Sequence, residues 1–267
     1  MTKKTKIGIC KLCGKTKKLS FEHVPPERAF NSQAVKVFPF EETIKVMAGN
    51  DGRMPWDFEG LQGRINQKGG GEYFLCEDCN SNTGSWYISE YVKMVHTLHN
   101  IIQKENLKPQ NRYSYTLIDL HPLRIYKAVM TMFCDINNDC FGDEKIRQFL
   151  LNKESTDFPV DKYHIYMSLI SPNMRRVSGL SVMHLSGIGL VTVSEMSSYP
   201  VGFSLYIDKP ETYTPPGLSI NEFATIPYDK KSNIIFQGIP YLEINSLFPD
   251  DFRSKEIINK MNRKNNV

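Results

Sequence analysis

The chain has 267 residues and a formal net charge of +4, with 40% hydrophobic and 23% charged residues. These values are typical of a soluble globular protein and exclude a broadly disordered chain. No apolar run is long enough to cross a bilayer, which excludes a membrane-spanning chain, and the length allows two domains. A mildly basic charge does not by itself indicate nucleic-acid binding.

The N-terminus is basic from Lys3 to Lys6, but only a few apolar residues follow before Cys10. A secretory signal needs a longer hydrophobic region, so we expect a cytoplasmic protein. Thiols are kept reduced there, and closely spaced cysteines are more often metal ligands than disulfides. Lysines crowd the first cysteine pair, either as solvated surface charge or as part of a nucleic-acid surface. They are Lys3, Lys4, Lys6, Lys11, Lys15, Lys17 and Lys18.

The first predicted element is a zinc knuckle around Cys10 and Cys13, followed by an extended segment over residues 18–22 that ends at His23. Two prolines, Pro25 and Pro26, then stop regular structure. Residues 27–70 are expected to be irregular, because glycine, asparagine and proline interrupt them. This stretch forms either a substrate loop or a folded cover over the site.

A glycine run over residues 69–71 predicts a hairpin turn that leads into a strand over residues 73–75. The second cysteine pair then starts a helix, in which apolar residues recur at three- and four-residue steps. We expect this helix to end at Lys108-Pro109 and place a domain boundary there. Residues 1–108 form one domain and residues 109–267 a second.

The second domain reads as a mixed one. Helical patterns cover residues 125–134 and 145–151, and a terminal helix is expected over residues 250–261. Alternating patterns predict strands at residues 165–169, 190–193, 201–207 and 234–236. We therefore expect helices first and an antiparallel sheet after them, in a domain that recognises the substrate or a partner.

The two Cys-x-x-Cys pairs fit a structural zinc site, because each pair places two thiolates on one tight turn. The predicted ligands are Cys10, Cys13, Cys76 and Cys79. Binding would contribute on the order of 10 kcal/mol to the folding of the small domain. The alternative is that four reduced cysteines are buried as small apolar side chains.

Three further residues can carry chemistry beside the zinc. His23 is suited to take a proton from water near neutral pH, and Glu22 supplies the hard oxygen ligand that Mg²⁺ prefers. Asn80 follows the second cysteine pair directly. It either caps the start of the helix or offers its amide oxygen to a metal ion.

These residues together closely resemble the zinc-containing branch of the HNH endonucleases, also called ββα-metal or His-Me finger nucleases. The resemblance covers roughly residues 8–86, and its pattern is Cys10-x-x-Cys13, Glu22-His23-x-x-Pro26 and Cys76-x-x-Cys79-Asn80. It implies a small zinc-stabilised ββα-metal module. Together with the patterns of the second domain, this predicts an α+β protein in which the module precedes a mixed helix plus antiparallel-sheet domain.

The resemblance also implies an activity, hydrolysis of phosphodiester bonds in DNA rather than RNA. His23 would be the general base, and Glu22 and Asn80 would bind a catalytic Mg²⁺ or Mn²⁺ ion. Architectures of this kind also suggest antiviral defence and restraint by a regulatory protein partner. Two alternatives stay open: a non-catalytic zinc module that binds nucleic acid or protein, and an RNase or nuclease toxin.

The chain departs from the family pattern at two places. The family commonly has an asparagine nine residues before the last one, where it braces the histidine loop, but Gly71 stands there. Asn66 and Asn50 are the candidates to replace it. Thr83-Gly84 stands where the family often has Lys-Gly, which predicts the loss of a phosphate contact. Two other groups are predicted to be structural: the histidines His96 and His99, and the reduced cysteines Cys134 and Cys140.

Overall fold

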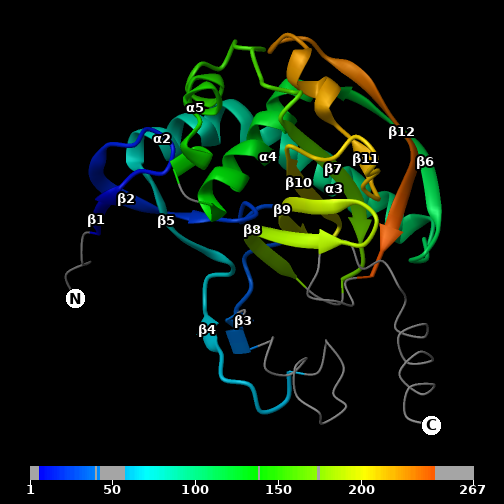
Figure 1. Cartoon of the computed structure of the whole chain (residues 1–267), viewed down its shortest axis with the longest axis horizontal. Helices are drawn as coiled ribbons and strands as arrows, with labels where there is room; N and C mark the ends of the chain where they lie inside the picture. Colours follow the sequence, from blue (N-terminus) through cyan, green and yellow to red (C-terminus); the bar gives the residue numbers. More distant parts are fainter. Residues whose placement is uncertain (1–5, 40, 43–57, 138, 173–174, 244–267) are drawn as a thin grey trace.

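The computed structural model describes residues 6–39, 41–42, 58–137, 139–172 and 175–243. Figure 1 shows two main sheets, with the helix α4 between the small sheet at one end of the molecule and the strands β6 and β12 at the other. The helix predicted for residues 250–261 and the candidate Asn50 lie outside the described residues. Among the described helices, none has the length and apolar character needed to span a membrane.

The small sheet has the strand order β1-β2-β5. Its strands are β1 (Ile7–Ile9), β2 (Thr16–His23) and β5 (Gly71–Cys76), and both pairings are antiparallel. The strand β2 ends at His23, as the sequence predicts, and His23 lies opposite Gly71. Hydrogen bonding thus brings together two segments that are about fifty residues apart in the chain.

Between β2 and β5 the chain is less irregular than predicted. The strands β3 (Val35–Val37) and β4 (Arg64–Asn66) pair with each other in antiparallel register. This short ribbon extends away from the two main sheets (Figure 1). Three residues on each strand give too little alternation for a sequence pattern to show.

A continuous helical arm follows β5. It consists of α2 (Glu77–Thr83), a π-helical turn (Gly84–Ile88) and α3 (Ser89–Lys104). The predicted apolar stripe is buried on α3, but the helix ends at Lys104 and not at Lys108-Pro109. Leu107 N donates to Ile102 O at 3.1 Å, so the chain turns off the helix before the proline.

The C-terminal part contains strands and helices in a mixed order. Its strand β6 (Arg112–Leu120) precedes α4 (Pro122–Ile136) and α5 (Glu144–Leu151), so the prediction of helices first was wrong. Short 3₁₀ turns cover Asp139–Gly142 and Asn221–Thr225. The later strands are β7 (Tyr163–Ile170), β8 (Arg176–Leu185), β9 (Gly189–Ser198), β10 (Val201–Ile207), β11 (Leu218–Ser219) and β12 (Ser232–Leu242).

The large sheet has the order β6-β12-β7-β10-β9-β8, and β11 pairs with β7. Most pairings are antiparallel, as predicted, but β12 runs parallel to β7 through Tyr241 and Leu242. The predicted strand over residues 201–207 has the same bounds as β10. The sheet packs on α4, most of whose residues are buried, and one hydrophobic cluster reaches from Cys10 to Tyr241.

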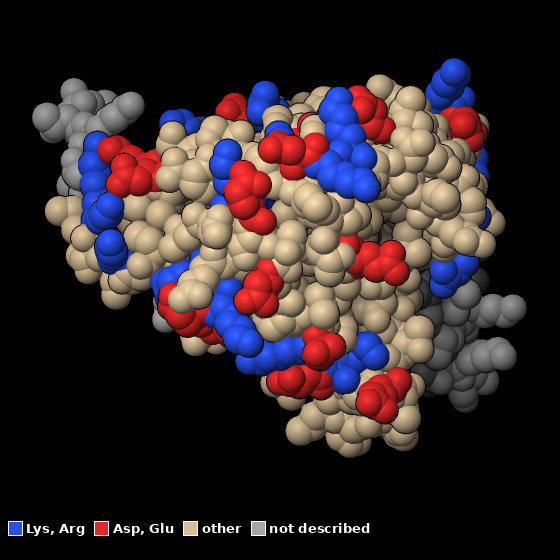
Figure 2. Space-filling model, turned by 90° about the horizontal axis from the view of Figure 1, so that it is seen from above, with Lys and Arg blue, Asp and Glu red and all other residues tan. Residues whose placement is uncertain are grey.

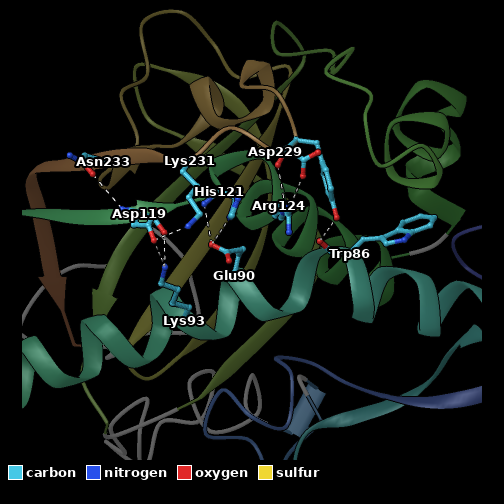
Figure 3. A network of polar contacts seen from close by, with 10 residues as sticks. Trp86, Glu90, Lys93, Asp119, His121, Arg124, Asp229, Lys231 and Asn233 are labelled. Carbon is cyan, nitrogen blue, oxygen red and sulfur yellow. Dashed lines mark hydrogen bonds and ion pairs between the residues drawn. The ribbon is translucent and has the colours of Figure 1, made fainter.

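Polar contacts fix α3 to the C-terminal part (Figure 3). Glu90 accepts from the backbone N of His121 at 3.1 Å and lies 3.2 Å from its Nδ1, and both side chains are largely buried. One turn further along α3, Lys93 donates to Asp119 O at 2.5 Å. These contacts anchor the helical arm that begins at the second cysteine pair.

Candidate functional site

The four predicted zinc ligands come together in space. Their sulfur atoms all lie within 4.8 Å of one another, and Cys13 Sγ lies 3.9 Å from Cys76 Sγ. Tetrahedral zinc with Zn–S bonds of about 2.3 Å places its sulfurs about 3.8 Å apart, so the cluster has the size of a zinc site. The cluster consists of Cys10 and Cys13 from the knuckle and Cys76 and Cys79 from the start of α2.

The knuckle is shaped to present a thiolate. Gly14 N donates to Cys10 O at 2.8 Å, and Gly14 has a φ of 69°, a conformation that favours glycine. A hydrogen bond from the Cys79 thiol, aided by backbone N–H groups such as that of Cys13, lowers the pKa of Cys10 to about 4. A deprotonated sulfur is the form that binds metal.

Residues after α4 donate hydrogen bonds to the backbone of the knuckle. Cys140 Sγ donates to Lys11 O at 3.2 Å, and Arg147 Nη1 donates to Leu12 O at 2.8 Å. In return, Lys11 Nζ donates to Asp135 O at 2.7 Å. The two carbonyls between the first cysteines are thus satisfied by residues more than a hundred positions away.

Glu22 and Asn80 lie next to each other beside the zinc cluster. A hydrogen bond from the Asn80 side chain to the Glu22 carboxyl group favours its ionised form, but burial is the larger effect and raises the pKa of Glu22 to about 7. Asn80 Nδ2 also donates to Ser20 Oγ at 3.0 Å. Because Nδ2 of Asn80 points to β2, its Oδ1 is the side-chain atom that is able to bind a metal ion.

Asn80 does not cap a helix. The first residue of α2 is Glu77 and its N-cap is Cys76, so Asn80 lies within the helix. The structure therefore removes the N-cap explanation that the sequence left open. The side chain contacts β2 instead, which leaves metal binding or bracing of the strand as its roles.

A further carboxyl group fits a cation near this pair. Asp135, at the end of α4, is 1% exposed, and neither of its carboxylate oxygens has a hydrogen-bond partner among the described residues. Burial raises its pKa well above the usual range, and the negative charge of Glu22 raises it further. A cation bound there would relieve the repulsion between the two carboxyl groups, and Glu22 and Asn80 are the residues predicted to hold it.

The His23 ring has a defined orientation. Its Nε2 lies 2.8 Å from Lys68 O, and because a carbonyl only accepts, Nε2 carries the proton. Nδ1 is then the nitrogen that can accept a proton from water. The ring also packs edge-on against Phe21, with 5.0 Å between the centroids.

Alternation along β2 separates His23 from the Glu22–Asn80 pair. Ser20 and Glu22 face Asn80, whereas Phe21 and His23 lie on the other face of the strand. The structure thus brings Glu22 and Asn80 together and places His23 at the strand end, where its ring is bonded to Lys68 O and not to Asn80 in the described part of the chain. A ligand that both groups reach would lie at the end of β2, where Glu22 and His23 are the last two residues.

A buried asparagine, Asn31, braces the loop around His23. Its Nδ2 donates to Pro25 O at 2.5 Å and to Gly70 O at 2.7 Å, and its Oδ1 accepts from Gly70 N at 2.7 Å. These bonds join the chain after β2 to the chain before β5. Asn31 therefore braces the His23 loop, a role for which the sequence offered Asn66 and Asn50 as candidates.

Gly71 cannot be replaced by the asparagine of the family pattern. A Cβ atom at Gly71 would lie 2.2 Å from Glu22 O, because β2 and β5 approach closely there. The glycine run is thus explained by backbone packing, and the Gly70 amide is already bonded to Asn31. The sequence did not predict the role of Asn31, because its bonds join segments that are distant in the chain.

Several of the N-terminal lysines are neutralised locally. Lys17 Nζ lies 2.8 Å from Asp78 and Lys18 Nζ lies 2.7 Å from Glu77, both in the first turn of α2. On the face shown in Figure 2, basic and acidic side chains are likewise interspersed. These observations favour solvated surface charge for Lys17 and Lys18.

The other candidates have structural contacts. His96 Nε2 donates to Arg28 O at 2.8 Å, and His99 Nδ1 lies 3.0 Å from the Tyr199 hydroxyl. The four-cysteine cluster is the one metal-binding group found among the described residues. Cys134 and Cys140 are both buried, and burial raises the pKa of Cys134 well above its usual range.

Comparisons with protein-family models, with curated proteins and with solved structures each found no significant match. The resemblance to HNH endonucleases therefore depends on the residues of this chain and on their geometry, and it stays a prediction.

Proposed function

We propose that the protein is a metal-dependent endonuclease of the HNH type that hydrolyses phosphodiester bonds in DNA. The observation that carries the proposal is the state of His23: a backbone carbonyl holds its Nε2 proton, which leaves Nδ1 as the base, at the end of the strand whose other face carries the Glu22–Asn80 pair. A four-cysteine zinc cluster next to that pair supports it.

His23 is the proposed general base. A phosphodiester at the end of β2 can be approached by His23 from one face of the strand and by Glu22 from the other. His23 Nδ1 takes a proton from the attacking water, which forms a new P–O bond while the bond to the leaving 3′ oxygen breaks. The carbonyl of Lys68 stabilises the resulting imidazolium through the Nε2 proton.

Glu22 and Asn80 are the residues proposed to hold Mg²⁺ or Mn²⁺. When bound, the ion supplies Lewis-acid stabilisation of the charge on the phosphate and on the leaving oxygen. Zinc held by Cys10, Cys13, Cys76 and Cys79 would keep β2 and α2, which carry these two residues, at a fixed distance. The C-terminal part is proposed to recognise the substrate or a regulatory partner, and defence against foreign DNA is a setting in which such a nuclease would act.

A cleavage assay tests the proposal. Zinc-loaded protein is incubated with duplex DNA, single-stranded DNA or structured RNA, with Mg²⁺, with Mn²⁺ or with neither. We expect ion-dependent cleavage of DNA, a fall of roughly 10²–10⁴-fold in the His23→Ala variant, and a strong fall in Asn80→Ala. The exposed His184 on β8 provides the matched control, and His184→Ala is expected to cut normally.

The outcomes separate the alternatives. Unchanged cleavage by His23→Ala, with zinc content and folding intact, would refute the mechanism. Preferential cutting of RNA would assign the chain to the RNases. Nucleic-acid binding without cleavage under any ion condition would favour a non-catalytic zinc module.

A further inference from the structure

Arg175 joins the turn that follows His23 to the large sheet. It lies just before β8, and its guanidinium donates through Nη1 to Asn31 Oδ1 and through Nη2 to Phe30 O at 3.1 Å. Its Nε donates to Ser198 Oγ, at the end of β9, at 3.0 Å. One side chain from the C-terminal part therefore holds the residue that braces the His23 loop.

These contacts form a geometric clamp and not an ion pair. The three acceptors of Arg175 are a side-chain amide, a backbone carbonyl and a hydroxyl, all of them neutral. Burial also lowers the pKa of Arg175. A guanidinium presents its donors in a rigid plane, so three bonds fix its partners in direction as well as in distance.

The same turn is held on its other side by α3. The Phe30 ring packs against the rings of His96 and His99, with 4.7 Å between centroids in both cases. Phe30 has a φ of 64°, an uncommon conformation for a residue with a side chain, and neighbouring contacts must hold it there. The turn is thus fixed between the helical arm and the large sheet.

We infer that Arg175 is a positioning residue for His23. Its bond to Asn31 Oδ1 orients the side-chain amide, and the Nδ2 of that amide donates to Pro25 O and Gly70 O. These two carbonyls lie on the two backbone segments beside His23. The segment before Gly70 also carries Lys68 O, the acceptor of the His23 Nε2 proton. The large sheet then sets the orientation of the His23 ring although it supplies no group to the reaction. This inference rests on the proposed function, because it specifies how the general base is held.

Two variants test the inference. Arg175→Met removes the planar donors and keeps a long side chain, whereas Arg175→Lys keeps the charge and reaches fewer acceptors. ¹⁵N NMR of the histidine rings, assigned with His23→Ala, reports which nitrogen of His23 carries the proton. We expect the Nε2–H form in the wild type and a mixture of both forms in Arg175→Met.

Kinetics provide the second readout. We expect kcat to fall about 10- to 100-fold in Arg175→Met with KM nearly unchanged, because a misplaced base slows the chemical step and not binding. The kcat of Arg175→Lys is expected to lie between those of the wild type and Arg175→Met. The control is Arg112→Met at the opposite edge of the sheet, where Arg112 Nη1 donates to Gly238 O at 2.9 Å, and both readouts should be unchanged there.

A wild-type ring-nitrogen pattern and a wild-type kcat in Arg175→Met would overturn the inference. If Arg175→Met does not fold, the same two measurements on Arg175→Lys decide, and values equal to the wild type refute the role. The NMR readout needs no cleavage. A wild-type protein that cuts no nucleic acid would therefore refute the proposed function, while a changed His23 proton position would still support the role of Arg175.

Discussion

The wild type is expected to lose free energy of unfolding as the pH rises, and the substitution Glu22→Gln is expected to prevent this loss. Without a divalent ion at the site, burial raises the pKa of Glu22 from 4.5 to about 7. Between these values the folded state keeps a proton that the unfolded chain has released, so the free energy of unfolding falls as the pH increases. Glutamine cannot ionise and is free of this effect.

The size of the effect follows from the two pKa values. At 1.36 kcal/mol per pKa unit, the full penalty is about 3 kcal/mol, of which about 2.5 kcal/mol develops between pH 5 and pH 8. This is an upper limit, because water reaches part of the Glu22 side chain. Asp135 changes in the same direction, and removal of the charge on Glu22 also eases its burial.

Urea unfolding measures this prediction in zinc-containing buffer that lacks other divalent ions. The stability difference between Glu22→Gln and the wild type should grow by about 2–3 kcal/mol from pH 5 to pH 8. Mn²⁺ at pH 8 should stabilise the wild type but not the variant. Glu77→Gln serves as the control, since Glu77 is exposed and pairs with Lys18. Parallel pH profiles for Glu22→Gln and the wild type would refute the reasoning.

Three further predictions concern the scaffold. Cys79→Ser should lose bound zinc and unfold the region around β2 and α2, measured by metal analysis and circular dichroism, whereas Cys134→Ala should keep its zinc. Gly71→Asn should lower stability by about 1–3 kcal/mol or more, since its Cβ would meet Glu22 O at 2.2 Å. The control Gly84→Asn meets no atom within 4 Å, and equal stability of the two variants would contradict the packing argument. His121→Ala should lower the free energy of unfolding by about 1–3 kcal/mol in urea, because the largely buried Glu90 loses the imidazole and keeps only the backbone N–H of residue 121. A loss below about 0.5 kcal/mol would show that the imidazole contributes almost nothing.

Sequence patterns predicted the elements that are strongly amphipathic or marked by special residues. The strand that ends at His23, the helix that starts after Cys76 and the strand over residues 201–207 belong to this group. Among the strands that were missed, β1, β3, β4 and β11 have only two or three residues, and β6 and β8 form the two edges of the large sheet. Edge strands bury few side chains, so their apolar alternation is weak.

The sequence predicted only those parts of the candidate site whose residues lie close together in the chain. The spacing of the cysteines predicted the four-sulfur cluster, because each pair is a local turn. Asn31 and Arg175 act through contacts between distant segments, and no local pattern marks them. Strand alternation predicts that Glu22 and His23 lie on opposite faces of β2. Only the tertiary structure shows that Asn80 packs against the Glu22 face.

The contacts behind the zinc knuckle bear on how this chain can be divided. Cys140 and Arg147 bond the carbonyls of Lys11 and Leu12, and both donors lie beyond residue 108. A fragment that stops at residue 108 would lose those partners and would also expose the apolar residues of α3 that the large sheet covers. Residues 8–86, which resemble an HNH nuclease, therefore depend on contacts with the rest of the chain. Transferring them to another protein would require α4 and α5 as well.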